Sequence, residues 1–514
     1  MLFDAPAEPV VADILVADGV ILDIRPGIEP DAATQVVDLQ DSLVLPAFVD
    51  AHAHITETAL LRRGVDLSLT GYSVSAILSE VGARSRILPG APVLGHGWDD
   101  LKIEEGRPPT ADELEYTAPG HEVYLSRVDV HSAVVSVTLA ERAGLRGLPG
   151  WDDSGRVERD AHHAARDWTR ARIAPQQREA LQRLALREAA VRGIGWVHEM
   201  SAPHVATEAD LASLVSIEGR LSAHGEDQVL PRVVPYRGVL VRDVDEAHDV
   251  VKRLADLGVA VAGLAGDLVV DGAVGSRTAR FHDPYLDSAD GHRGHLYLDA
   301  DAIAAHVAAC TEAGLQAGFH VIGDAAVAEV VEGFAMAAAR VGAPAIRAAR
   351  HRLEHVEAVS PTDVARLAAL GVVASVQPAF DAAWGGDSGM YAVRLGRDRA
   401  ARMNPFAGFV AGGVPLAFGS DSPVTPFDPW GAIRAAVLHQ EPRHRIRLAA
   451  AIHAHTAGGH HAAGRDGGRL VPGADASFGV WYADDGTGRL PDFPAGEDAP
   501  ELSFSVIGGR VSAG

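Results

Sequence analysis

Two histidines separated by one alanine, His52 and His54, are the strongest candidates for chemistry in this sequence. They end the apolar run SLVLPAFVDAHAH, which has the composition of a β-strand. On a strand, residues two apart point to the same face, whereas on a helix the same spacing separates them by about 200°. The triplet recurs at His453 and His455, but within the alanine-rich, helix-like segment RLAAAIHAHTAGGHHAAGR. We therefore expect the first pair to bind a metal ion and the second pair not to.

Histidines and carboxylates also stand at the ends of other apolar runs. These residues are His198, Glu199, Asp267, Asp271, His320, His355 and Asp421. Imidazoles mixed with carboxylates are the ligand set of a divalent metal, with zinc the default and iron or manganese as alternatives. Polar helical surroundings, by contrast, indicate solvent exposure for four further histidines, His162, His163, His460 and His461.

Eight apolar runs must position these side chains. They span residues 42–54, 193–200, 230–238, 267–274, 315–324, 352–357, 371–380 and 414–424. Helical stretches rich in Ala, Leu and Arg separate them, which is the pattern of βα units and a parallel sheet. Eight such strands make a TIM barrel, and the residues at their carboxyl ends meet at one face. We therefore predict an α/β fold with a (β/α)8 TIM barrel.

The rest of the chain predicts two additions to that barrel. Residues 1–45 and 465–514 contain short β-branched runs broken by turns, so the two ends are expected to form one composite β-sandwich domain. The metal-dependent barrel domain would then span 46–464. The stretch after its first strand is too long for one helix, and we expect an inserted subdomain at about 66–165, over the barrel mouth.

Composition and charge exclude several classes of function. The 514 residues include 45 Lys and Arg against 69 Asp and Glu, a net charge of −24 that is spread along the chain. Without a basic run, neither nucleic acid nor an anionic membrane is an expected partner. No apolar stretch reaches the roughly 18 residues that span a bilayer, and the first basic residue is Arg25, so we expect a cytoplasmic protein. The single cysteine, Cys310, is predicted to be a buried structural thiol.

These segments together resemble the amidohydrolase superfamily and, within it, amidohydrolase family 3, the YtcJ-like metal-dependent hydrolases. The resemblance covers nearly the whole chain and rests on motifs such as LVLPAFVDAHAHI, GIGWVHE, DGAVGSRTA, GFHVIGDAAV, RLEHVE, GVVASVQPAF and GSDSPVTPFDPW. It implies a barrel, a composite β-sandwich and hydrolysis of amide-type C–N bonds outside peptide backbones. It also implies metal-centre roles for the first-strand pair His52 and His54, the fifth-strand His320, the sixth-strand His355 and the eighth-strand Asp421.

The sequence departs from that family at the fourth strand. Relatives with two ions commonly have a carboxylated lysine there, but the only lysines are Lys102 and Lys252, and the matching position is Asp267. Aspartate is several ångströms shorter than a carboxylated lysine, so we favour one tightly bound ion over two and expect Asp267 to be too short to bridge, with Glu199 as another candidate bridge. The ligands of the single ion would be His52, His54, His320 and Asp421.

The ligand set predicts the reaction. A bound zinc lowers the pKa of its water to about 7 and polarises a carbonyl, so we expect cleavage of a non-peptide C–N bond, such as that of an N-acyl or N-formyl amine, by metal-activated hydroxide. Asp421 is expected to take the proton of the water and return it to the leaving nitrogen. His355 is either a ligand of a second ion or a catalytic partner. Candidates for substrate binding are Trp98, Asp271 and Arg277.

Three other functions remain open from the sequence. A deaminase of a heterocyclic substrate would use the same scaffold, and release of ammonia rather than an amine would identify it. A non-catalytic amidohydrolase-like scaffold protein would lack metal, although all five ligand positions are present. An acidic module for cationic partners rests on the net charge alone. The expected partner is a small-molecule substrate, and assembly into a homo-oligomer is left open.

Overall fold

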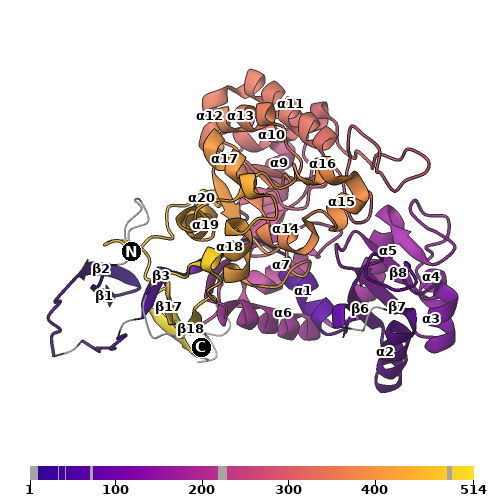
Figure 1. Ribbon diagram of the computed structural model, residues 1–514, viewed down its shortest axis with the longest axis horizontal. Coiled ribbons are helices and arrows are strands. Elements are labelled where there is room, and N and C mark those ends of the chain that lie inside the picture. The colour runs from indigo at the N-terminus through magenta and orange to yellow at the C-terminus, as the bar shows by residue number, and fades with distance from the viewer. Residues whose placement is uncertain are drawn as a thin grey trace.

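Eight parallel strands form the centre of the computed structural model, which describes residues 10–32, 34–40, 42–69, 73–217, 229–482 and 489–513. In the order of the sheet they are β16 (Leu416–Phe418), β15 (Val373–Val376), β14 (Arg352–His355), β13 (Gln316–Val321), β12 (Gly263–Leu264), β11 (Arg232–Arg237), β10 (Ile194–Ser201) and β4 (Phe48–Ala53). A parallel bridge between Ala53 and Ser422 joins the first strand to the segment after the last. The predicted TIM barrel is confirmed (Figure 1).

Helices separate these strands along the chain, and most of them pack around the outside of the barrel. They are α1 (Ile55–Arg62), α6 (Pro175–Ala190), α7 (Glu208–Val215), α9 (Val244–Asp256), α10 (Ala300–Glu312), α11 (Asp324–Val341), α12 (Ala343–Ala349), α13 (Pro361–Ala369), α14 (Pro378–Trp384), α15 (Met390–Leu395), α16 (Arg397–Ala400), α17 (Phe406–Gly412), α18 (Pro429–Val437), α19 (Leu448–Ala454) and α20 (Ala457–Ala462), with a 3-10 turn η2 (Pro442–His444). Both faces of the strands are therefore buried, which accounts for their nearly continuous apolar runs. Helices α14 and α15 differ from the others, since they lie near the carboxyl ends of the strands.

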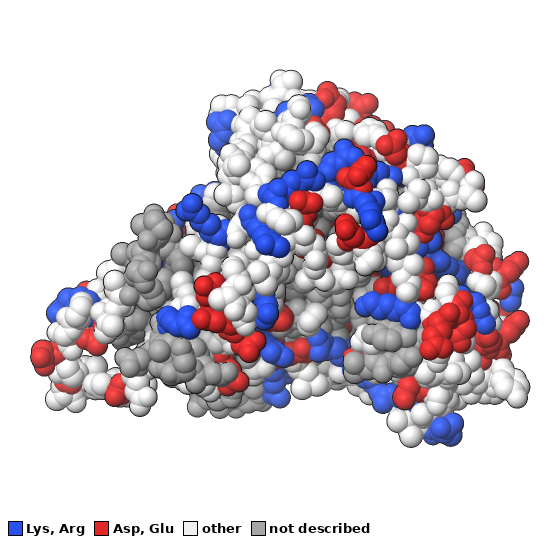
Figure 2. All heavy atoms as spheres, in the orientation of Figure 1, with Lys and Arg blue, Asp and Glu red and all other residues white. Residues whose placement is uncertain are grey.

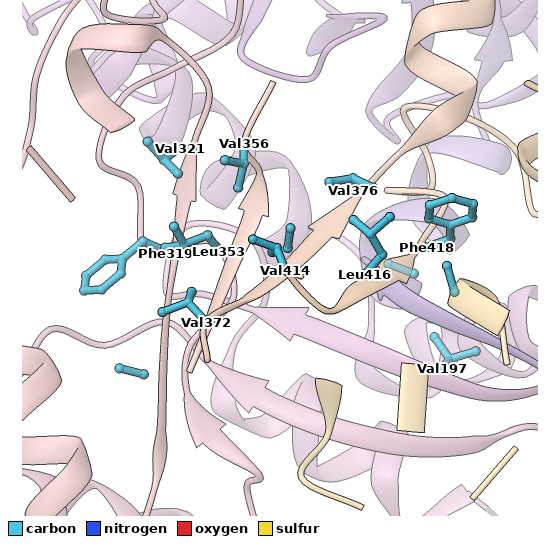
Figure 3. Close-up of a cluster of buried hydrophobic side chains, with 14 of the residues drawn as sticks. Val197, Phe319, Val321, Leu353, Val356, Val372, Val376, Val414, Leu416 and Phe418 are labelled. Atoms are coloured by element: carbon cyan, nitrogen blue, oxygen red, sulfur yellow. The ribbon is translucent and has the colours of Figure 1, made fainter. Parts of the chain in front are cut away.

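Apolar side chains of neighbouring strands form the main core. Figure 3 shows Phe319 of β13 next to Leu353 of β14, and Val376 of β15 next to Leu416 of β16, with Phe418 of β16 near the second pair. All five are buried. This packing fixes the spacing of the strands, and with it the positions of the polar residues that follow them.

The fourth strand lies elsewhere than predicted. The sequence places it in the run that begins at Asp267, but β12 already ends at Leu264. The chain then turns at Gly266, which has a φ of 101°. Glycine adopts this conformation without strain, whereas a residue with a Cβ atom does not. Beyond that turn Val269 forms only an isolated bridge with His320. As a result Asp267 follows the carboxyl end of β12 directly, among the other strand-terminal side chains.

Strands from both ends of the chain share one sheet. Its order is β19 (Arg510–Ala513), β18 (Glu501–Ile507), β17 (Phe478–Tyr482) and β3 (Leu43–Pro46), and β3 pairs antiparallel with β17. A hairpin of β1 (Asp13–Ala17) and β2 (Val20–Arg25) packs on this sheet, where Ile21 is buried against Phe478 and Val506. The 3-10 turn η3 (Phe493–Ala495) precedes β18. The composite sandwich is thus present, whereas residues 1–9 of the predicted domain lie outside the described residues.

A separate five-stranded sheet is inserted between the first and second barrel strands. Its order is β5 (Val65–Asp66), β6 (Val93–Trp98), β7 (Val123–Arg127), β8 (Ser132–Val135) and β9 (Arg156–Glu158). The helices around it are α2 (Val74–Ile87), α3 (Ala111–Thr117), α4 (Val137–Arg142) and α5 (Arg159–Ala171), with a 3-10 turn η1 (Leu67–Leu69). In Figure 1 this insertion and the terminal sheets lie on opposite sides of the barrel.

Three features agree with the composition. Cys310 is fully buried in α10, as predicted. On the face drawn in Figure 2, acidic and basic side chains are interspersed rather than gathered into one basic patch. Among the described helices, none has the length and hydropathy needed to cross a membrane.

Candidate metal centre

The strand β4 brings His52 and His54 together as predicted. Their Nε2 atoms are 3.3 Å apart, and Oδ1 of Asp421 lies 3.3 Å from the first and 3.1 Å from the second. Asp421 is held there because its amide donates to the carbonyl of His52, so the segment after β16 is tied to β4. Four ligands at about 2.0–2.1 Å around zinc stand about 3.3–3.4 Å apart. The three atoms therefore have the mutual spacing of ligands that share one ion.

Asp267 also reaches this group, contrary to the expectation that its side chain is too short. Its Oδ2 lies 3.1 Å from Nε2 of His54, and its Oδ1 lies 3.7 Å from both Nε2 of His52 and Nδ1 of His320. The early end of β12 supplies the missing reach, because it places the backbone of Asp267 at the centre. The carboxylate thereby contacts two sets of histidines: the pair on β4, and a second set of His320 with His355.

Hydrogen bonds fix which nitrogen faces the centre in three of its histidines. Nδ1 of His52 pairs with Oε2 of Glu354 at 2.8 Å, and Nδ1 of His355 pairs with Oε1 of Gln377 at 2.7 Å. Nε2 of His320 contacts the carbonyl of Gly272 at 3.3 Å. Since each acceptor takes the N–H of the ring, the other nitrogen is left as a lone-pair donor toward the centre.

Among the described residues, three buried atoms of the centre have no hydrogen-bond partner. They are Nε2 of His355, Oδ1 of Asp267 and Nδ1 of His54. Unpaired polar atoms are costly when buried, and a shared cation would satisfy the first two. The donor types and their spacing thus fit a divalent metal, and these two atoms lie on the side of His320 and His355.

The electrostatics of the centre favour a bound cation. Burial lowers the pKa of His52, but the charges of Asp421 and Glu354 outweigh burial and raise it to about 9. Burial raises the pKa of Asp421, yet His52 and His54 hold it well below its ordinary value. Both shifts have one cause: carboxylates surround the histidines closely enough to stabilise positive charge between them.

Residues behind the ligands hold the barrel interior together. Arg352 donates to both oxygens of Glu354, and its Nη1 lies 3.0 Å from Nδ1 of His198. The carboxylate of Glu199, the other candidate bridge, accepts the amide of Ile55 at 2.7 Å. His198 and Glu199 therefore support the backbone around the centre, and Glu199 fixes the first residue of α1.

The second histidine triplet is divided as predicted. His453 is exposed near the end of α19, whereas His455 is buried and its Nδ1 lies 2.9 Å from the carbonyl of Val49. The ring of His455 also contacts that of Phe48. The two imidazoles thus have different surroundings, and His455 has a structural partner.

The three residues predicted to bind substrate each have partners inside the protein. Trp98 lies in the apolar core of the insertion, and its indole N–H donates to the carbonyl of Leu125. Asp271 is fully buried and accepts the amides of Arg280, Ile322 and Gly323, which leaves its carboxylate occupied. Arg277 pairs with Asp287 through two hydrogen bonds. In all three cases, the polar atoms that form these bonds are satisfied inside the protein.

Two cavities adjoin the centre, and the sequence analysis missed most of their residues. The larger, of about 260 Å³, touches His54 and Asp267; its further lining includes Glu57, His131, Arg159, His163, Arg166 and His204. The smaller, of about 30 Å³, touches His320, His355 and Asp421; its further lining includes His131, Glu357, Phe380, Trp384, Met390 and Val424.

The prediction of exposed histidines on α5 is wrong. His162 is buried and lies 2.8 Å from the Tyr124 hydroxyl, and His163 lines the larger cavity. His460 is also buried, against Trp196. On α5 the buried residues His162, Arg166 and Thr169 recur at helical spacing and mark the face that packs inward.

Comparisons with known proteins match this geometry. Residues 35–502 match the model of a family described as Amidohydrolase family. The chain is 26% identical to Putative amidohydrolase YtcJ of Bacillus subtilis, with 93% of this chain and 90% of that protein covered. It is 22% identical to N-substituted formamide deformylase of Arthrobacter pascens, with 87% and 84% covered.

A solved structure has the same fold. An uncharacterized metal-dependent hydrolase from Pyrococcus furiosus superposes with a TM-score of 0.67 at 24% identity, with 91% of this chain and 94% of that chain covered. Since the family model spans most of the sequence and includes all the residues of the centre, the chain belongs to the amidohydrolase family.

Proposed function

We propose that this protein is a metal-dependent hydrolase that cleaves a non-peptide C–N bond of a small molecule. The observation that carries the proposal is the spacing of donor atoms: Nε2 of His52, Nε2 of His54 and Oδ1 of Asp421 lie 3.1–3.3 Å from one another. Zinc is the default ion for imidazole and carboxylate ligands in this arrangement.

We further propose two ions rather than the single ion that the sequence favours. His52, His54, Asp267 and Asp421 would hold one ion, and Asp267, His320 and His355 would hold the other. Asp267 supports this revision because its oxygens reach both sets of histidines. A bridge by aspartate would replace the carboxylated lysine that the sequence lacks.

The residues of the centre divide the work of hydrolysis. When bound, a divalent ion lowers the pKa of a water molecule and polarises the carbonyl of the substrate. Asp421, which lines the smaller cavity, takes the proton of the attacking water. It then returns that proton to the leaving nitrogen, because an amine leaves a tetrahedral intermediate only after protonation. His355 is a ligand in this scheme, oriented by Gln377.

An N-acyl or N-formyl amine is the proposed substrate class. The relative from Arthrobacter pascens is named an N-substituted formamide deformylase. The smaller cavity also supports a short acyl group, because 30 Å³ holds only about two water molecules. A heterocyclic deaminase is the second candidate and would use the same centre.

Metal analysis and product analysis test these proposals together. Zinc-loaded protein is dialysed, its metal content is measured, and N-formyl amines, N-acetyl amines and aminated heterocycles are offered as substrates. We expect two ions per chain and release of an amine; ammonia from a heterocycle instead would favour the deaminase. Dialysed protein that retains no zinc would contradict both.

A matched pair of variants tests the bridge. Asp267→Asn should lower the metal content from two ions to one or fewer, because an amide binds metal more weakly than a carboxylate. Glu199→Gln is the control and should retain two ions, since its side chain can still accept the amide of Ile55. An Asp267→Asn protein with two ions would show that another group bridges them.

A further inference from the structure

The larger cavity is built mainly by the insertion. Helix α5 contributes Arg159, His163 and Arg166, while the segment after β10 contributes His204. The cavity also touches His54 and Asp267, so a molecule bound at the centre can extend into it. At about 260 Å³ it is close to the lower end of the range for small-molecule sites. This chamber therefore can select substrates.

One of the two arginines of the chamber is already neutralised. Nε of Arg166 lies 3.5 Å from Oε1 of Glu57, and its terminal nitrogens donate to the carbonyls of Val130 and His204. Arg166 and Glu57 are both buried. The pair holds α5 against α1 and the loop at Val130, and it contributes little net charge to the chamber.

Arg159 is in a different state. Among the described residues, no carboxylate forms an ion pair with its guanidinium, and its buried Nε has no hydrogen-bond partner. Its backbone also has a φ of 49°, in the left-handed region that non-glycine residues seldom adopt. Asp160 lines the same chamber, but it is exposed, so water screens its charge.

His163 and His204 do not supply a competing charge to the chamber. Burial lowers the pKa of His163 to about 4, and burial also holds the pKa of His204 well below its ordinary value. The two rings are stacked with their centroids 4.6 Å apart. At neutral pH both rings are uncharged, so neither competes with Arg159 for an anion.

We propose that Arg159 binds a carboxylate carried by the substrate, on the part that enters the chamber from the centre. The inference rests on the proposed function and narrows its substrates to amides that bear an anionic group. A guanidinium offers two parallel N–H donors that match a carboxylate, and partial removal from water strengthens the pair. The carboxylate would pair with a guanidinium of the chamber for which the described residues supply no carboxylate.

Binding of hydroxamates to the zinc-loaded protein tests the inference. The probes are HONH–CO–(CH2)n–COO⁻ compounds with n from 2 to 5, each compared with the amide-ended molecule of equal length. The hydroxamate binds metal, and calorimetry gives the Kd. We expect the best carboxylate-ended probe to bind at least about tenfold more tightly than its amide partner, and Arg159→Gln to abolish that preference.

Two neighbouring variants are controls. Arg156→Gln removes the same charge from a guanidinium that already pairs with Glu158, and it should keep the preference. Asp160→Asn should keep or increase it. Equal binding of the two probe types by the parent protein would overturn the inference. A preference for the carboxylate-ended probe that remains in Arg159→Gln would also overturn it, and so would a loss of that preference in Arg156→Gln as large as the loss in Arg159→Gln.

Turnover on the same preparations separates this inference from the proposed function. A protein that prefers carboxylate-ended probes through Arg159 but hydrolyses no amide contradicts the proposed function alone. A protein that hydrolyses amides with no preference for a carboxylate contradicts the role of Arg159 alone.

Discussion

The tripeptide His-Ala-His occurs twice in this protein. In one copy the two imidazoles lie together, and in the other they point to different surroundings. On β4 the imidazoles of His52 and His54 meet with their Nε2 atoms 3.3 Å apart. On α19 the same spacing sends His453 to the surface and His455 into the core, toward Val49. Side-chain chemistry is identical in the two copies, so the backbone period alone decides which one can chelate.

Each copy also has the partners that suit its position. Nδ1 of His52 meets a carboxylate, that of Glu354, whereas Nδ1 of His455 meets a neutral carbonyl. A carboxylate makes the opposite nitrogen a better metal donor, and a carbonyl only holds the ring in place. Local sequence alone would not reveal this, because Glu354 comes from the sixth strand of the barrel.

Removal of the strand pair should give the largest effect. His52→Ala and His54→Ala are each expected to abolish detectable turnover and to lower the zinc content, because each ring would be a donor to the first of the two proposed ions. His453→Ala should change neither quantity. Metal analysis and amide hydrolysis measure both, and equal zinc loss from the two copies would break the comparison.

Asp421 is the carboxylate that lies beside His52 and His54, whereas the ring of His455 meets a backbone carbonyl instead. Asp421→Asn retains the shape of the side chain but cannot move a proton, so kcat should fall by about 10²- to 10⁴-fold with the fold intact. Steady-state kinetics at matched zinc occupancy measure this, and circular dichroism checks the fold. A variant within a few-fold of the parent would remove Asp421 from proton transfer.

The carboxylate behind His52 sharpens the comparison further. In Glu354→Gln the amide oxygen can still accept the N–H of His52, but the negative charge is lost. We expect zinc affinity to fall by about 10- to 100-fold, the usual effect of losing such a supporting group. Competition with a chelator measures it. Unchanged affinity would mean that Glu354 only positions the ring.

His455→Ala should give the smallest effect on function and a clear effect on stability. Metal content and turnover should match the parent, whereas the free energy of unfolding should fall by about 2 kcal/mol, because the Val49 carbonyl loses its partner and a cavity forms. Burial lowers the pKa of His455 to about 4.

Below pH 6.5 the His455 ring takes up a proton in the unfolded chain but not in the folded protein. The free energy of unfolding therefore decreases as the pH falls from 6.5 to 4. His455→Ala should lose less stability over that window than the parent. Unfolding curves at several pH values measure the difference, and an equal loss would mean that His455 is not buried in its neutral form.

Much of the barrel follows from patterns in the chain. Eight apolar runs separated by helical stretches predict the strands. Because His320, His355 and Asp421 stand at the ends of such runs, they are predicted to meet at one face of the barrel. The reach of Asp267 was not predictable, because it depends on where β12 stops and on the turn at Gly266. Periodicity locates a strand but does not fix its last residue.

The larger cavity was also hidden from the sequence. Polar residues on α5 are typical of a solvated helix, and only the docking of the insertion against the barrel turns His163 and Arg166 inward. The placement of Trp98 also depends on tertiary packing. Its side chain lies in the apolar core of the insertion, rather than in either cavity beside the metal centre. In both cases a tertiary contact overrides a local preference.

The pairing of β3 with β17 has a consequence for how the protein matures. These strands lie near opposite ends of the described chain, and the link between Asp421 and His52 spans almost as far. Contacts between residues so far apart in the sequence form late in folding. The conformational entropy lost in closing the long loop between them must be paid before the contacts add stability. Synthesis runs from the N-terminus, so β4 emerges long before its last partners exist. A metal ion held by His52, His54 and Asp421 would therefore bind only late in folding, and a chain interrupted before Asp421 would present the two histidines without that carboxylate.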